Sequence, residues 1–519
     1  MVSEPELAVV GAMVLTDLDA APTLADIVVK NGRIAAVTAP AERTDRRDPV
    51  VDGRGKLVIP GLINAHYHSH DVLARGMFED IPLEVWIALA ILPPTRRLTA
   101  REVRLRTLLG AIDCLRNGIT TVQDMLGCGP GSEEHVEAAI KAYDEVGIRC
   151  VLGLQVGNRP PIDCLPGIRA HLPESLAPLL SASPATVRDI LDFVSAPLAA
   201  KASDRLTFAI APGSPQRCSF ELMRGLAELA SRCSLPLVTH VNESKLQVFL
   251  AQELYADYGG SPLDFLQAAG ALNARLCMAH GIWFGDAEIE RIAGAGAAVA
   301  TCPTSNLKLK NGVAPLRKLK QAGVRLAMGA DNTSAGDAQN VFEAMKLVCN
   351  LNAGKGTAAS TLRAHDALAM ATLGGADALG LSDRLGKIEV GMCADLTLLD
   401  LSDPSYVPLN DAVRQIVYCE SGRGVHTVIV DGNVVVDNRK LMTIDYDALL
   451  DEVREASEIH ARASQAHRAK LETVLPYIAK VVRDQGEKPL AFNRWPSADD
   501  ELALERVAIR PQTTSRTQP

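Results

Sequence analysis

The stretch that determines the fold reads Val58-Ile59-Pro60-Gly61-Leu62-Ile63-Asn64-Ala65-His66-Tyr67-His68. Its apolar residues are typical of a buried parallel strand, and two histidines follow where that strand would end. Side chains at positions i and i+2 of an extended chain project to the same side, which suits two ligands on one ion. His66 and His68 therefore predict a metal site at the end of this strand, although an H-x-H pair alone is a weak signal.

Seven further short apolar segments follow, separated by longer amphipathic stretches. They cover residues 119–123, 150–154, 206–211, 236–240, 276–280, 297–301 and 325–329. Helical patterns, such as those over residues 133–145, 220–232 and 286–294, lie between them. With residues 62–66 as the first strand, eight strand–helix units predict an α/β fold, a (β/α)8 TIM-like barrel, over residues 61–384. A doubly wound sheet is the alternative, but no Gly-x-Gly-x-x-Gly motif follows the early strands.

Short strands joined by turns occur at both ends of the chain. They cover residues 7–14, 25–29 and 33–37 before the barrel, and residues 395–401, 425–430 and 433–436 after it. We expect residues 1–60 and 385–445 to form one small β-sandwich domain. Residues 446–519 form a helical extension, with one or two helices over residues 448–482 and a disordered end at residues 511–519. This extension is interpreted as an oligomerisation arm or as a cover over the pocket of a neighbouring subunit.

The composition excludes several classes of protein. Hydrophobic residues make up 47% and charged residues 22%, as in ordinary globular proteins. The net charge of −9, without a basic stripe, argues against nucleic acid as a partner. No segment approaches the roughly 18 apolar residues of a membrane span, and the N-terminus lacks the pattern of a signal peptide. The 11 cysteines are scattered and predict reduced thiols, so we expect a cytoplasmic protein with a small-molecule partner.

Other predicted strands also end in chemically active residues. His240 and His280 each close a strand, and Asp331 follows the eighth. Because all strands of a parallel barrel end on the same face, these side chains would converge with His66 and His68. One histidine at a strand end is more often structural, and it is the combination that favours a site. Imidazoles with a carboxylate suit Zn²⁺, or alternatively Fe²⁺, Mn²⁺ or Co²⁺.

Two residues are suited to proton transfer. Glu243 lies three residues beyond His240, from where it would reach the pocket without occupying the ion, although its spacing alone also fits a solvated surface position. His280 is interpreted as a group that polarises the attacking water rather than as a ligand. A metal-bound water loses its proton near pH ~7 instead of ~15.7. Asp331 would accept that proton, and Glu243 would deliver one to the substrate nitrogen or leaving group.

Residues 58–68 resemble the first-strand signature of the amidohydrolase superfamily. The chain is similar in particular to the branch that holds cytosine, guanine and S-adenosylhomocysteine deaminases and s-triazine hydrolases. The matching segments are residues 116–125, 240–243, 279–281, 302–309, 328–331 and 386–396, and the likeness covers about residues 7–440. It departs from the pattern at Asn332, where glycine is commoner, and the chain continues past the usual C-terminus.

The resemblance implies a mononuclear site with His66, His68, His240 and Asp331 as ligands of one divalent transition metal, Zn²⁺ in the first instance. Glu243 and His280 would be the proton-handling pair. Dinuclear branches use a carboxylated lysine on a middle strand, whereas Lys141 and Lys201 lie away from strand ends. The resemblance also implies a homodimer or homotetramer.

The implied reaction is the attack of metal-bound hydroxide on an sp² carbon. The leading expectation is deamination or dealkylamination of an N-heterocycle of purine, pyrimidine, pterin or triazine type. The alternatives are hydrolysis of an acyclic amide, urea, carbamate or thiocarbamate, and a non-catalytic scaffold, which would be expected to have lost ligands. Candidate substrate-binding residues are Arg75, Glu79, Trp86, Arg159, His70 and Asn306.

Overall fold

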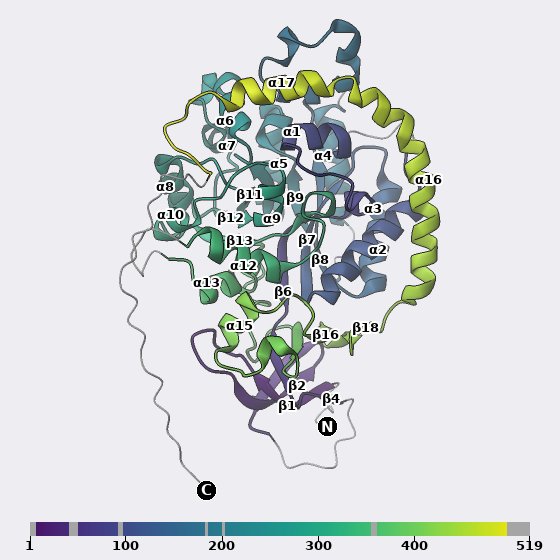
Figure 1. The fold of residues 1–519 in the computed structure, drawn as a ribbon, viewed down its shortest axis with the longest axis vertical. Helices are drawn as coiled ribbons and strands as arrows, with labels where there is room; N and C mark the ends of the chain where they lie inside the picture. Colours follow the sequence, from purple (N-terminus) through teal and green to yellow (C-terminus); the bar gives the residue numbers. More distant parts are fainter. Residues whose placement is uncertain are drawn as a thin grey trace.

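The computed structural model describes residues 7–40, 50–91, 97–181, 185–199, 203–353 and 361–495. Its larger body is a parallel sheet surrounded by helices (Figure 1), with strand order β13-β12-β11-β10-β9-β8-β7-β6-β14. These strands are β6 Leu62–His68, β7 Ile119–Gly127, β8 Arg149–Val156, β9 Leu206–Pro212, β10 Leu237–Val241, β11 Leu276–His280, β12 Ala298–Thr301, β13 Arg325–Met328 and β14 Asp331–Asn332.

The sheet closes into a barrel through its last strand. β14 pairs in parallel with β6, with Asp331 opposite Tyr67. The predicted eighth strand is therefore present but divided into β13 and β14 by Gly329 and Ala330. The Ala330 N–H donates to the side chain of Asn64 at 2.9 Å, so this donor is taken up outside the strand ladder. The predicted (β/α)8 fold is confirmed, and every barrel strand ends on one face.

Helices follow most of the barrel strands and cover the outside of the sheet (Figure 1). The α-helices between β6 and residue 396, where the chain returns to a second sheet, are α1 Leu83–Trp86, α2 Ala100–Arg116, α3 Glu133–Val146, α4 Val187–Ser195, α5 Phe220–Cys233, α6 Lys245–Leu254, α7 Pro262–Ala268, α8 Asp286–Ala295, α9 Pro303–Lys308, α10 Leu316–Gln321, α11 Thr333–Gly336, α12 Val341–Leu351, α13 Ala364–Met370 and α14 Leu373–Ala378. Their apolar faces pack on the outward residues of the strands in one continuous core. In the part of the chain that the structure describes, no helix is long and apolar enough to cross a membrane.

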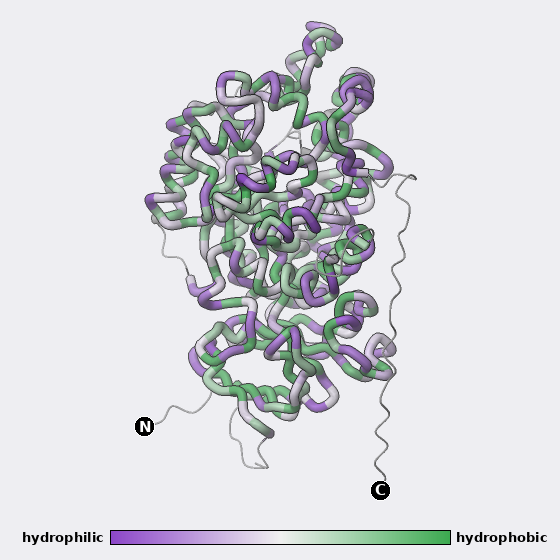
Figure 2. The backbone as a smooth tube through the Cα atoms, turned by 90° about the vertical axis from the view of Figure 1, so that its left-hand side faces the viewer, coloured by the Kyte–Doolittle hydropathy of each residue, from purple (hydrophilic) through white to green (hydrophobic). Residues whose placement is uncertain are grey.

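A second, smaller sheet is built from both chain ends, as predicted, and forms the lower body of the molecule (Figures 1 and 2). Its strand order is β18-β17-β16-β15-β5-β1-β2-β3, with β4 on β1. The strands are β1 Leu7–Val14, β2 Thr23–Lys30, β3 Arg33–Thr38, β4 Val50–Asp52, β5 Lys56–Pro60, β15 Leu396–Asp400, β16 Val425–Val430, β17 Asn433–Asp437 and β18 Lys440–Leu441. Helix α15, Ala412–Tyr418, lies between β15 and β16 in sequence.

The stretch from Val58 to His68 belongs to both bodies. β5 ends at Pro60 in the smaller sheet, and β6 begins at Leu62 in the barrel. Gly61 lies between them, where a Cβ atom would stand 2.2 Å from the Thr120 hydroxyl, so only glycine fits. The two bodies are also joined by the buried Arg149 of β8, whose guanidinium donates to both carboxylate oxygens of Asp395 at 2.9 Å.

The C-terminal extension forms two helices, α16 Tyr446–Glu472 and α17 Leu475–Gly486. α16 runs along the outside of the barrel against α2, and α17 crosses the end of the barrel on which the strands terminate, where it packs on α1 and α6 (Figure 1). Ile478 and Val481 of α17 are buried against Val85 and Leu246. The extension thus lies on its own barrel. The predicted disorder at residues 511–519 falls outside the described residues.

Candidate active site

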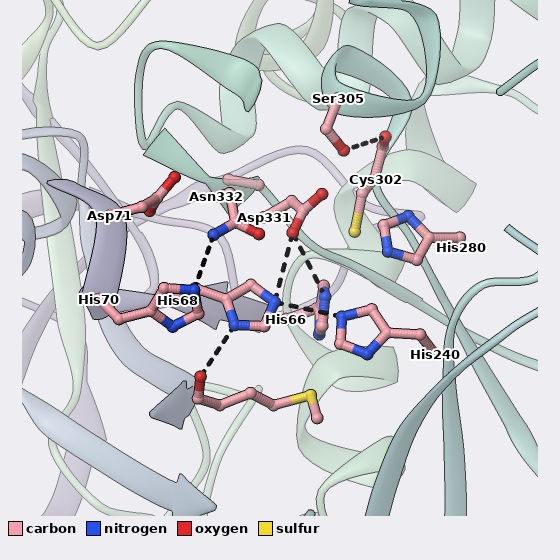
Figure 3. Close-up of polar contacts among 12 residues, drawn as sticks. His66, His68, His70, Asp71, His240, His280, Cys302, Ser305, Asp331 and Asn332 are labelled. Carbon is pink, nitrogen blue, oxygen red and sulfur yellow. Dashed lines mark hydrogen bonds and ion pairs between the residues drawn. The ribbon is translucent and has the colours of Figure 1, made fainter. Parts of the chain in front are cut away.

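Five predicted residues meet at the carboxyl-terminal face of the barrel. His66 and His68 come from β6, His240 from β10, His280 from the end of β11, and Asp331 from the start of β14. Figure 3 shows the Asp331 carboxylate directed at the imidazoles of β6, with His240 and His280 beside them. The convergence follows from the barrel itself, because parallel strands present their last residues on one face.

The donor atoms of this cluster lie close enough to share one ion. His68 Nε2 is 3.2 Å from His240 Nε2, and Asp331 Oδ1 is 3.4 Å from His66 Nε2 and 3.5 Å from His68 Nε2. One ligand atom each from His66, His68 and His240 lies within 4.8 Å of the others, and the same holds for His66, His280 and Asp331.

Buried donor atoms without partners show that the cluster fits a cation. His66 Nε2, His280 Nε2 and Asp331 Oδ1 are buried and make no hydrogen bond within the described residues. Each buried polar atom left unpaired costs about 1–3 kcal/mol, so three in one place require compensation. A divalent cation bound by His66 and Asp331 would supply it for two of these atoms, and zinc prefers imidazole nitrogen and carboxylate oxygen as donors.

In His68 and His240 the second ring nitrogen fixes the orientation of the imidazole. His68 Nδ1 is 2.8 Å from the Met125 carbonyl oxygen, and His240 Nδ1 contacts the Gly213 carbonyl oxygen. These acceptors require N–H at Nδ1 and leave the lone pair of Nε2 directed into the cluster.

Burial sets the protonation of the cluster. It lowers the pKa of His66 to about 4 and that of His240 to about 3, and it holds the pKa of His68 well below its usual range. Burial alone would raise the pKa of Asp331, but contact with His66 and the electrostatic influence of the neighbouring histidine rings outweigh it and leave that pKa well below the ordinary value. Neutral imidazoles beside an ionised carboxylate are the state in which these side chains bind a metal.

The local backbone is strained where the site residues leave their strands. Asn242, His280 and Asp331 have φ values of 50°, 69° and 63°, in the left-handed region that non-glycine residues rarely occupy. Each such residue costs about 1–3 kcal/mol and persists only when its surroundings enforce it. Gly329 shows how closely the chain passes the site, since a Cβ there would stand 2.8 Å from the Cβ of His66.

Glu243 is the buried acid of the site. Its Oε1 atom lies 3.6 Å from His280 Nε2 and accepts a hydrogen bond from the Asn311 amide at 3.0 Å. Burial raises the pKa of Glu243 to about 7. A carboxyl group with that pKa exchanges protons near neutral pH, as general acid–base catalysis requires. Asn311 was not among the predicted residues, and its position three residues after the end of α9 carries no signal in the sequence.

Two of the predicted substrate-binding residues lie against the cluster. Asn306 is buried, and its side-chain oxygen lies 2.8 Å from His280 Nδ1, so it orients that ring. The ring of His70 packs edge-on against His68 with centroids 4.9 Å apart, and the Gly127 N–H donates to its Nδ1 at 3.2 Å. Asn306 and His70 therefore contact histidine rings of the cluster and help to hold them in position.

The other four lie further out. Trp86 is buried in α1, and its indole N–H donates to the Ser334 hydroxyl at 2.9 Å. Arg75 is exposed and pairs with Asp113 at 2.7 Å. Glu79 is also exposed, and Arg159 is half-buried in the segment after β8. Their contact with substrate stays a prediction.

Comparison with known proteins points to one family. The amidohydrolase family matches residues 57–435. The chain is 32% identical over 440 residues to a 5-methylthioadenosine/S-adenosylhomocysteine deaminase of Pyrococcus furiosus, covering 83% of this chain and 96% of the relative. It is 31% identical over 422 residues to a 5'-deoxyadenosine deaminase of Methanothermobacter thermautotrophicus, covering 81% of this chain and 91% of the relative.

Solved structures resemble the chain over nearly their whole length. An adenosine deaminase from Xanthomonas campestris with bound zinc is 28% identical, with a TM-score of 0.75 over 88% of this chain and 98% of that one. An atrazine chlorohydrolase from Arthrobacter aurescens complexed with zinc is 24% identical, with a TM-score of 0.76 over 87% of this chain and 100% of that one, and shares the fold.

Proposed function

This chain belongs to the amidohydrolase family and hydrolyses carbon–nitrogen bonds of N-heterocycles, and from that premise we propose that it deaminates an adenosine derivative. The proposal is supported by relatives that are named as deaminases of such compounds and align with most of this chain. The observation that carries it is the buried Glu243, which faces His280 beside the cluster of imidazoles and Asp331. A deaminase needs such an acid, because a ring nitrogen must be protonated for the amino group to leave.

We propose further that His66, His68, His240 and Asp331 hold one divalent transition metal, and that this ion is Zn²⁺. The unpaired Nε2 atom of His66 and the unpaired Oδ1 atom of Asp331 support this assignment. When bound, the ion would polarise water and bring its pKa down toward ~7.

The protein's own residues would then manage the protons. His280 donates through Nδ1 to Asn306 and keeps Nε2 as an acceptor, which suits it to hold and orient the attacking water. The ionised Asp331 is placed to take a proton from that water. Glu243, protonated up to a pKa of about 7, delivers its proton to the ring nitrogen. The oxygen of the water becomes bonded to the carbon. The proton taken up by Asp331 would then pass to the amino group, the C–N bond would break with loss of ammonia, and the remaining hydroxyl proton would return to Glu243 as the carbonyl forms.

The compartment and the oligomeric state of the enzyme are separate proposals. All 11 cysteines are free of disulfides, which supports a reducing compartment, the cytoplasm. A homodimer or homotetramer follows from the family resemblance alone. Light scattering of the purified protein would test the oligomeric state.

An ammonia-release screen tests the proposed reaction. We expect release from adenosine, 5'-deoxyadenosine, 5'-methylthioadenosine or S-adenosylhomocysteine, and little from guanine, cytosine, pterins or aminotriazines. Ureas, carbamates and amides are assayed in parallel by product chromatography. Turnover of only these acyclic compounds, or release confined to triazines, would refute the adenosine proposal.

Metal analysis tests the ligand assignment separately. We expect about one transition metal per chain, lost together with activity in His66→Ala and Asp331→Ala. His365→Ala serves as the matched control, because His365 is half-buried in α13 and pairs with Asp19 at 3.4 Å rather than with any residue of the cluster. Full activity in a metal-free preparation would contradict the assignment.

A further inference from the structure

Arg494, near the end of the described chain, binds the loop that follows His280. Its guanidinium donates through Nε to the Ile282 carbonyl oxygen at 2.9 Å and through Nη2 to the Phe284 carbonyl oxygen. The planar guanidinium suits this arrangement, because its N–H groups are fixed in a fork that reaches two acceptors at once. These contacts join the C-terminal extension to the segment between β11 and α8.

The backbone of Arg494 binds a second loop. Its carbonyl oxygen accepts the Val313 N–H at 2.7 Å. The neighbouring Gly312 has a φ of 112° and faces Arg494, where a Cβ would stand 3.0 Å from that carbonyl oxygen. Arg494 therefore connects two loops, residues 281–285 and 311–313, that are separate in the sequence.

Both loops are hydrogen-bonded to Glu243 or to the residue before it. The Trp283 indole N–H donates to the Asn311 carbonyl oxygen at 2.7 Å, and the Asn311 amide donates to Glu243 Oε1 at 3.0 Å. Trp283 also exchanges hydrogen bonds with Asn242, the residue before Glu243, at 2.9 and 3.1 Å. The position of the Glu243 carboxyl group is thus fixed by residues that Arg494 joins.

Contacts of the residues that precede Arg494 help to hold it in place. The Lys245 ammonium donates to the Gly486 carbonyl oxygen at the end of α17, at 2.6 Å. The Phe492 ring lies 6.3 Å from that of Trp283, and the Arg494 guanidinium stacks 4.4 Å above the Phe492 ring. Figure 1 shows the chain leaving α17 at the barrel end where the strands terminate.

We propose that Arg494 is a positioning residue for the reaction, which acts through the loops 281–285 and 311–313 to hold the carboxyl group of Glu243 against His280. The C-terminal extension is then a working part of its own active site. This inference rests on the proposed role of Glu243 as the proton donor. It adds a residue that touches neither substrate nor ion.

Single variants test the proposal first. In the metal-loaded enzyme, Arg494→Gln is expected to lower kcat by about tenfold to a hundredfold, with a much smaller change in KM, because small displacements of a catalytic group cost that much. Arg494→Lys should be intermediate, since one ammonium cannot reproduce the fork. Metal content should stay unchanged. Arg462→Gln, in the exposed i,i+4 pair with Glu458, is the matched control on the same extension and should behave as the wild type.

A double-mutant cycle separates positioning from general destabilisation. If Arg494 acts through Glu243, adding Arg494→Gln to Glu243→Gln should cause little further loss of kcat. An equal loss in both backgrounds, or an unchanged kcat in both Arg494→Gln and Arg494→Lys, would overturn the proposal.

Hydrogen exchange gives a readout that needs no substrate. Amides of residues 282–284 and 313 should exchange faster in both Arg494 variants than in Arg462→Gln, while the barrel strands stay protected. Unchanged exchange there would overturn the proposal even if no substrate were found. If the wild type deaminates nothing in the screen, the proposed function fails instead, and the exchange result still reports on Arg494.

Discussion

Burial acts on the acid and on the imidazoles of the site in opposite directions. It raises the pKa of Glu243 to about 7 and lowers that of His66 to about 4, because a low-dielectric surrounding disfavours whichever form is charged. Both groups are therefore driven toward neutrality at the same pH. Asp331 differs because imidazoles surround it and stabilise its charge. One buried volume thus holds neutral imidazoles, one ionised carboxylate and one carboxyl group that stays protonated up to about pH 7.

Replacing Glu243 by glutamine removes the exchangeable proton and keeps the shape of the side chain. We expect Glu243→Gln to lose about 10²- to 10⁴-fold in kcat while retaining the metal, as measured by steady-state kinetics and metal analysis. Glu253→Gln on the exposed side of α6 is the control. Loss of metal in Glu243→Gln would make Glu243 a ligand, and near-normal turnover would remove it from the mechanism.

The same carboxyl group predicts a basic limb in the pH profile. Only protonated Glu243 can donate, so above its pKa of about 7 the value of kcat/KM should fall about tenfold per pH unit. A bound cation favours the ionised carboxylate and lowers this pKa, which moves the limb to lower pH in the loaded enzyme. A profile that stays flat to pH ~9, or the same limb in Glu243→Gln, would argue against the assignment.

The strands that carry the site were predictable because each is a short apolar run that ends in a polar residue. β11 and β16 begin and end where the sequence pattern places them. The division of the last strand at Gly329 could not be predicted, because a break in hydrogen bonding does not change the hydrophobic periodicity of the sequence. The residues that the C-terminal extension contacts could not be predicted either. An apolar stripe on α17 predicts that it packs, whereas its contacts with Val85 and Leu246 depend on how distant loops fold.

Gly329 gives a prediction for this strand break. A methyl group there would stand 2.8 Å from both the Cβ of His66 and the sulfur of Cys302. Gly329→Ala should therefore displace β6 from β13, and we expect it to lose most of its metal, measured as metal per folded chain. Gly294→Ala in α8 is the control, since nothing lies within 4 Å of its added Cβ. Equal metal content in the two variants would show that β6 and β13 can move apart without loss of metal binding.

At the scale of the whole molecule, a buried ion pair joins the barrel to the smaller sheet. Arg149 is 1% exposed and donates to Asp395 through two nitrogens, and its Nη2 also reaches Asp431 at 3.1 Å. The attraction of Asp395 outweighs burial and holds the pKa of Arg149 above its ordinary value. The charge of a barrel residue is thus neutralised by carboxylates that flank the strands of the smaller sheet, in a buried position.

Removing one partner of such a pair leaves a buried charge uncompensated. We expect Arg149→Met to lower the free energy of unfolding by about 3–5 kcal/mol, as measured by urea denaturation. Arg454→Met, in an exposed pair with Asp451, should change it by no more than about 0.5 kcal/mol. Similar effects of the two substitutions would mean that the buried pair does not join the bodies.

The pairing of β14 with β6 also has a consequence for biosynthesis. His66 and His68 leave the ribosome early, whereas Asp331 follows only after the intervening strands have been made. With the proposed ligand set, the full site would form only when the ring of strands is complete. Metal uptake by that full set would then report that the barrel has closed, and a chain truncated before Asp331 would lack one of the proposed ligands.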